Sequence, residues 1–123
     1  MIENCKIKST MLGYEGHGML TCSLFLEGAG WTVSFGGYCL DQYGKRPEGR
    51  RYATSIGFQA ITEILNTLEV KTWEELKGKY IRAESNGIGS TCEKIGHLMK
   101  DKWFSFREFF EQHENTSEAQ NGQ

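Results

Sequence analysis

The sequence lacks any long apolar run, and its opening residues lack the features of an export signal. A membrane-spanning helix needs roughly 20 consecutive apolar residues, and no segment approaches that length. The chain opens Met-Ile-Glu-Asn-Cys-Lys, which has neither the basic start nor the apolar stretch of a signal peptide. We therefore expect a cytoplasmic protein that does not bind membranes.

Metal and redox motifs are also missing. Cys5, Cys22, Cys39 and Cys92 form no CxxC pair, which excludes the zinc-ribbon and thioredoxin signals. We expect buried, reduced thiols that act as small hydrophobic groups. The histidines show no HxH or HExxH spacing. We therefore expect neither a metal ion nor a cofactor.

An excess of basic charge is absent as well. The chain carries 14 Lys and Arg residues against 16 Asp and Glu residues, a net charge of −2. A protein that grips nucleic acid over its whole surface is usually strongly basic. The composition thus disfavours nucleic acid as a partner, although it permits a local basic patch.

Alternation of apolar and polar residues predicts three strands, over residues 4–12, 19–27 and 31–41. Glycine-rich turns separate them at 13–18 and 27–30. Because short turns join antiparallel neighbours, we expect these strands to form a meander.

The middle of the chain changes character. Residues 41–53 break every periodicity and hold the only proline, Pro47, which predicts a long surface loop. Apolar residues then recur at helical spacing from Ala60 to Leu68, and Thr54 or Ser55 can cap the start of this helix.

The remaining chain predicts shorter elements. Thr72 opens a capping box, strands are expected over 79–83 and 92–99 around a turn at 86–89, and Ser105 caps a last helix.

Together these patterns predict an α+β fold in a single domain spanning residues 1–112. We expect a mostly antiparallel sheet of about five strands, one main helix packed on a face and a short C-terminal helix. Phe104 and Phe109 can staple the start of that helix. Residues 113–123 are polar and free of aromatics, so we expect a disordered tail.

The double glycine Gly36-Gly37 is the most informative local feature. Glycine inside a strand marks either a bulge or a close approach to the backbone. Tyr38 and Asp41 follow at once, so the segment is our best candidate for one wall of a site.

Arginine and aromatic residues suit a ligand that carries phosphate, because the guanidinium fork binds phosphate and rings stack on bases. The simpler interpretation is solvated charges and core aromatics. Neither a catalytic residue nor a nucleophile elbow is evident, and we lean against an enzyme. The candidate ligand-binding residues are His17, Phe35, Gly36, Gly37, Tyr38, Asp41, Arg50, Arg51, His97, Lys102 and Trp103.

Four blocks of the sequence form a recognisable combination: Tyr14–Thr21, Phe35–Asp41 (FGGYCLD), Trp73–Arg82 (WEELKGKYIR) and Ile95–Phe104 (IGHLMKDKWF). The combination resembles an uncharacterised family of small phage and prophage proteins, over roughly residues 5–110. The resemblance implies a phage accessory protein that acts in the cytoplasm of the host bacterium.

Small phage accessory proteins frequently counter host defence, which suggests three hypotheses by analogy. The first is a homodimer or higher homo-oligomer that sequesters a small nucleotide-derived signal. The second is an anti-CRISPR-like inhibitor that binds a defence protein directly. The third is a small nucleotide hydrolase that uses His17, His97 and Asp41.

Overall fold

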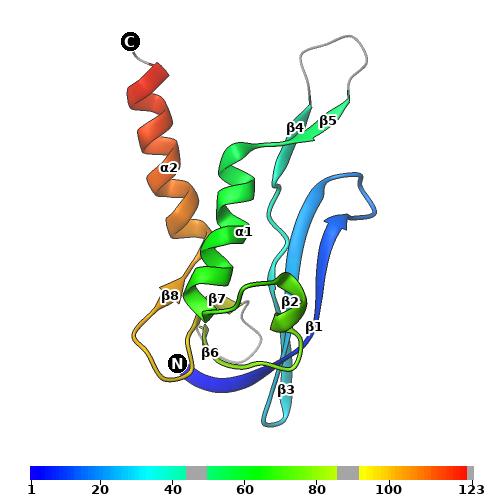
Figure 1. Cartoon of the computed structure of the whole chain (residues 1–123), viewed down its shortest axis with the longest axis vertical. Coiled ribbons are helices and arrows are strands. Elements are labelled where there is room, and N and C mark those ends of the chain that lie inside the picture. The colour runs from blue at the N-terminus through cyan, green and yellow to red at the C-terminus, as the bar shows by residue number, and fades with distance from the viewer. Residues whose placement is uncertain (44–49, 86–91, 122–123) are drawn as a thin grey trace.

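A six-stranded antiparallel sheet with helices packed against it forms the body of the protein (Figure 1). The computed structural model describes residues 1–43, 50–85 and 92–121. The strand order in the sheet is β3-β2-β1-β6-β7-β8. Its strands are β1 (Ile2–Tyr14), β2 (Leu20–Gly28), β3 (Trp31–Gly36), β6 (Tyr80–Ser85), β7 (Cys92–Gly96) and β8 (Trp103–Phe104). The α+β prediction and the β1–β2–β3 meander are confirmed.

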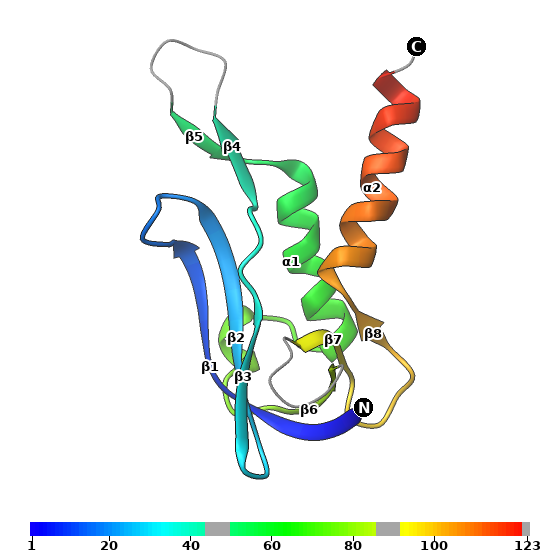
Figure 2. The same cartoon turned by 180° about the vertical axis from the view of Figure 1, so that it is seen from behind.

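Strand β1 joins the two halves of the sheet. Its first half pairs with β6, from Ile2 opposite Glu84 to Lys6 opposite Tyr80, and the rest of the strand pairs with β2. The β1–β2 register shifts between Ile7 and Ser9, which is the sign of a bulge. Figure 2 shows β1 curving through this region, so that the sheet wraps around the core.

The core lies on the concave face of this sheet. Cys22, Leu24 and Leu26 of β2 are buried, whereas the alternating residues Phe25 and Glu27 are exposed. This is the period-2 pattern of a strand with one buried face. Helix α1 (Ser55–Leu68) closes the core with Ala60, Ile64 and Leu68, all fully buried.

The predicted helix starts are confirmed. Thr54 is the N-cap of α1, and its Oγ1 accepts a hydrogen bond from the Gly57 N–H at 2.9 Å. Thr72 caps the 3₁₀ helix η1 (Trp73–Leu76) in the same way. Ser105 accepts from the Glu108 N–H at 3.3 Å at the start of helix α2 (Phe106–Asn121).

The aromatic staple at the start of α2 is also present. The rings of Phe104 and Phe109 lie 5.8 Å apart. Helix α2 is longer than the short helix expected, because its backbone continues to Asn121. The disorder expected for residues 113–123 stays a prediction.

Two predictions about the middle of the chain are corrected. The strand expected over 31–41 ends at Gly36, where the backbone takes a positive φ of 111°. The ends of the expected loop 41–53 form a two-stranded sheet of β4 (Asp41–Tyr43) and β5 (Arg51–Ala53). Both strands are too short for their alternation to stand out.

The last predicted strand also differs from expectation. It ends at Gly96 rather than at residue 99, and the chain returns to pair with it as β8. The predicted turn at 86–89 and residues 44–49 lie outside the described residues. No helix in the described part of the chain combines the length and the apolar character that crossing a membrane requires.

Candidate functional site

The double glycine lets the chain cross tightly over strand β2. A Cβ at Gly36 would lie 2.4 Å from the carbonyl oxygen of Cys22, which no side chain tolerates. Gly37 also has a positive φ, of 87°, and its N–H donates to the same oxygen at 2.8 Å. Both residues therefore need the conformational freedom of glycine. The predicted close approach to the backbone is confirmed at Gly36.

Beyond the glycines, the chain continues beside β2 without regular pairing. Thr21 Oγ1 donates to the Tyr38 carbonyl at 2.6 Å, and the Leu40 N–H donates to the Leu20 carbonyl at 2.9 Å. Leu40 is buried under the first turn of α1, where a Cβ on Gly57 would lie 2.3 Å from the Leu40 carbonyl oxygen. Leu40 thus anchors the chain in the core immediately before Asp41.

Asp41 and Arg51 form an ion pair between the two strands of the β4–β5 hairpin, in which the carboxylate is buried. The Asp41 side chain is 0% exposed. It accepts from Arg51 Nε at 2.9 Å and from Arg51 Nη2 at 2.7 Å. These hydrogen bonds are the main reason that the pKa of the Asp41 carboxyl lies well below its ordinary value.

Cys39 adds a thiol to this ion pair. Its Sγ donates to the Asp41 carbonyl at 3.0 Å and lies 3.6 Å from Arg51 Nη2. Cys39 is exposed, which corrects the expectation that all four thiols are buried. Burial raises the pKa of the Cys5 and Cys22 thiols to about 12 and that of Cys92 to about 11.

The aromatic candidates have different environments. Phe35 is buried, and its ring lies 5.3 Å from that of Phe106 and 6.2 Å from that of Phe104, so it belongs to the core. Tyr38 stacks on Phe106 at 5.0 Å and yet leaves 44% of its surface exposed. Of Phe35 and Tyr38, only Tyr38 has enough exposed surface to contact a partner.

His17 lies in the turn between β1 and β2. Its Nδ1 is 2.9 Å from Glu15 Oε2, and its backbone N–H donates to Glu15 Oε1 at 2.7 Å. The hydrogen bond to Glu15 raises the pKa of His17, and it lowers the pKa of Glu15. The pair shapes the turn and leaves the imidazole exposed.

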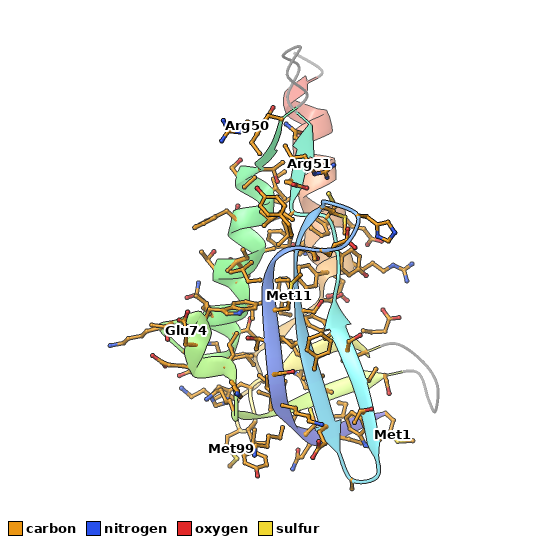
Figure 3. The ribbon with its side chains drawn as sticks, turned by 90° about the vertical axis from the view of Figure 1, so that its right-hand side faces the viewer. Met1, Met11, Arg50, Arg51, Glu74 and Met99 are labelled. Carbon is orange, nitrogen blue, oxygen red and sulfur yellow. The ribbon has the colours of Figure 1, made fainter. Side chains whose placement is uncertain are left out.

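His97, Lys102 and Trp103 lie at the other end of the molecule. Figure 3 labels Arg50 and Arg51 at one end and Met99 at the opposite end. His97 Nδ1 accepts from the Met99 and Lys100 N–H groups, both at 3.1 Å. The ring therefore supports the turn before β8.

A carboxylate at the end of α1 holds this turn in place. Glu69 lies 2.8 Å from Lys100 Nζ, 3.5 Å from Lys102 Nζ and 3.4 Å from His97 Nε2. The hydrogen bond from Lys100, with the nearby charges of Lys100, Lys102 and His97, lowers the pKa of Glu69. The Lys102 charge is thus directed at Glu69.

Trp103 covers a glycine. A Cβ at Gly96 would lie 2.5 Å from its ring, and the Arg82 guanidinium lies 4.5 Å from the ring centroid on a cation–π contact. Arg82 also donates to the carbonyls of His97 and Lys100. Trp103 is therefore part of the same structural cluster.

The candidate residues thus fall into two groups. Asp41 and Arg51 meet in the β4–β5 hairpin, and Tyr38 shortly before it stacks on α2. Arg50 and the turn that holds His17 lie at the same end (Figures 1 and 3). His97, Lys102 and Trp103 lie at the opposite end. The structure does not bring His97 together with Asp41, as a shared hydrolase site requires.

Sequence reasoning missed several exposed apolar side chains in elements at the same end as the first group. Tyr14 and Phe58 are 65% and 63% exposed, and Leu12 and Tyr52 are also exposed. Phe58 lies off the buried stripe of α1, and a large apolar residue on the polar side of a helix is the signal that could have found it.

Among the residues that the structure describes, no three His, Cys, Asp or Glu side chains gather closely enough to hold a metal ion. Comparison with protein-family models, with curated proteins and with solved structures gives no match for this chain.

Proposed function

We propose that this chain is a phage accessory protein that counters bacterial immunity by stoichiometric binding of a defence protein. The resemblance of four sequence blocks to small phage proteins supplies the biological setting. The observation that carries the choice of a protein partner is the exposure of the aromatic side chains Tyr14, Tyr52 and Phe58, together with Tyr38, in elements at the end that holds the β4–β5 hairpin.

The apolar groups come from three elements. Leu12 and Tyr14 end β1, Tyr52 lies in β5, and Phe58 lies in the first turn of α1. Tyr38 adds a half-exposed ring that stacks on α2. Exposed aromatic residues with a polar surround are typical of protein interfaces, where they act as anchors.

Among the described residues, the pairing of the charged side chains favours the same choice. A phosphate-bearing ligand is best held by guanidinium groups that face it. The Arg51 fork instead holds Asp41 through two hydrogen bonds. The positive groups at the other end, Lys100 and Lys102, lie against Glu69. Binding to a protein partner does not require unpaired positive groups that face the ligand.

Plaque assays on hosts that each carry a single defence system test the proposal. Expression of the chain is expected to restore plaquing in at least one such host. The double variant Tyr14→Ser/Phe58→Ser is expected to lose that effect. Tyr80→Ser is the matched control, because Tyr80 is 58% exposed and lies in β6, at the other end of the molecule.

The defence protein of the affected system is then purified and mixed with the chain. We expect a complex of defined stoichiometry that forms with wild type and the control but not with the double variant. Failure of the chain to restore plaquing in any host, or equal loss with both variants, contradicts the proposal.

A small nucleotide-derived signal is the second candidate ligand. Arg50 is exposed next to the Asp41–Arg51 pair, and the half-exposed ring of Tyr38 can stack on a base. Calorimetric titration against cyclic nucleotides and cyclic ADP-ribose isomers tests it. Heat of binding that disappears in Arg50→Ala supports this candidate, and silence across the panel rejects it.

A further inference from the structure

Strand β3 forms an open edge of the main sheet. It is the terminal strand in the order β3-β2-β1-β6-β7-β8, and in the described part of the chain its only ladder partner is β2. The opposite edge is β8, which has two residues and runs directly into the cap of α2. A very short strand is a protected edge, whereas the six residues of β3 are long enough to pair.

The pairing pattern shows which backbone groups of β3 point outward. Gly28 pairs with Trp31 across a two-residue turn, and such a turn closes on a hydrogen-bonded pair. Trp31, Val33 and Phe35 therefore bond to β2. The N–H and C=O groups of Thr32 and Ser34 point away from β2, and both side chains are exposed.

The sequence of this edge lacks two common features that protect an edge strand from pairing. Natural edge strands are blunted by charged side chains, especially lysine, or by proline. Trp31–Gly36 reads WTVSFG and contains neither. The inner strand β1, by contrast, carries Lys6 and Lys8. A charged side chain is most expected on an edge strand, and β3 has none.

We propose that β3 pairs with β3 of a second copy of this chain, antiparallel about a two-fold axis through Val33. This register places Thr32 of each copy opposite Ser34 of the other. Those are the residues whose backbone groups face outward, so both pairs can exchange N–H and C=O hydrogen bonds. A two-fold interface uses the same patch twice and must match itself.

The chemistry of the edge favours a second copy over an unrelated peptide. Like charges placed directly opposite each other destabilise strand pairs, and β3 has no charge to bring face to face with itself. Thr–Ser pairs across strands are favourable. The strand ends at Gly36, where the positive φ turns the backbone out of the ladder and limits pairing to this short segment. This inference does not depend on the proposed function.

The oligomeric state gives the first test. Sedimentation velocity of wild type is expected to show twice the chain mass of 14.0 kDa, in equilibrium with monomer. The double variant T32K/S34K places lysines opposite lysines and is expected to be monomeric, as is T32E/S34E. Gln59→Lys/Asn66→Lys is the control, because it adds the same charge at exposed positions of α1.

A mixture of the two charged variants tests the register. The lysine and glutamate variants, each monomeric alone, are expected to form a heterodimer when mixed, measured by native mass spectrometry with one variant isotope-labelled. A wild type that is monomeric at every concentration, or a lysine variant that stays dimeric, overturns the proposal. Monomers that fail to combine overturn the register.

Hydrogen exchange of the wild type keeps the proposal testable if a charged variant fails to fold. The amides of Thr32 and Ser34 are expected to exchange more slowly as protein concentration rises. The amide of Val33, which already bonds to β2, is expected to change little. Concentration-independent exchange at Thr32 and Ser34 contradicts the pairing.

Discussion

Arg51 holds the buried carboxylate of Asp41 with two hydrogen bonds, 2.9 Å from Nε and 2.7 Å from Nη2. Asp41 lies opposite Ala53 in the β4–β5 register and Arg51 lies opposite Tyr43, so the ion pair links the two strands diagonally. A bidentate fork fixes both distance and orientation. The same contact directs the charge of Arg51 into the protein.

The ion pair predicts an acid-dependent loss of stability. The pKa of Asp41 lies well below its ordinary 3.8, mainly because Arg51 hydrogen-bonds the ionised form. A lowered pKa stabilises the fold above the unfolded-state value, and the contribution disappears as pH falls through the folded-state value. Asp41→Asn is therefore expected to lower the free energy of unfolding at neutral pH, and its gap from wild type is expected to shrink below pH 3.8.

Urea unfolding at a series of pH values measures this gap. Glu74→Gln, which removes an exposed carboxylate, is the control and is expected to show no comparable change. A gap between Asp41→Asn and wild type that stays constant into strong acid contradicts the assignment.

The two glycines after β3 predict different costs for the same substitution. Gly37→Ala adds a Cβ in open space, so it carries only the strain of a positive φ, roughly 1–3 kcal/mol. Gly36→Ala adds that strain and drives the Cβ into the Cys22 carbonyl oxygen. We expect Gly36→Ala to be clearly the more destabilising, measured by urea unfolding at neutral pH. Equal losses for the two variants are incompatible with this geometry.

The exposure of the four thiols predicts that one cysteine reacts faster than the others. The thiolate is the reactive form, and burial raises the pKa of Cys5, Cys22 and Cys92 to between about 11 and 12. Cys39 is exposed. Ellman's reagent is expected to modify one thiol quickly in the native protein and four after denaturation. Cys39→Ser is expected to remove the fast phase. A fast phase that persists in this variant shows that another cysteine is the reactive one.

The turn between β1 and β2 predicts an altered histidine titration. Hydrogen bonding to Glu15 raises the pKa of His17 above its ordinary 6.5. NMR titration of the imidazole is expected to show this rise in wild type. Glu15→Gln is expected to return the His17 pKa toward 6.5, because the neutral amide does not favour the charged ring. An identical titration in both proteins refutes the contact.

Much of the fold was predictable because its signals are local. The alternation in β2 and the stripe from Ala60 to Leu68 each lie within one element, and the caps at Thr54 and Ser105 need only a hydroxyl at the right position. Strands β4, β5 and β8 were missed because two or three residues are too few to show a period.

The candidate site was less predictable because it depends on distant pairing. The sequence singled out both Asp41 and Arg51, and nothing in it indicated that they bind each other, since the contact follows from the β4–β5 register. His97 and Lys102 looked available because Glu69, their partner, lies at the end of α1, far from them in the sequence. Spacing along the chain does not report such contacts.

The shared strand β1 gives the chain an uneven order of assembly. The second half of β1 meets β2 across a short turn, so that hairpin can close as soon as both strands have been synthesised. The first half, with Cys5 opposite Ile81, has no partner until β6 has emerged. Closing so long a loop is entropically slow. The earliest residues of the sheet are thus expected to be among the last to pair, because the Cys5 backbone has no strand partner on the nascent chain until β6 arrives.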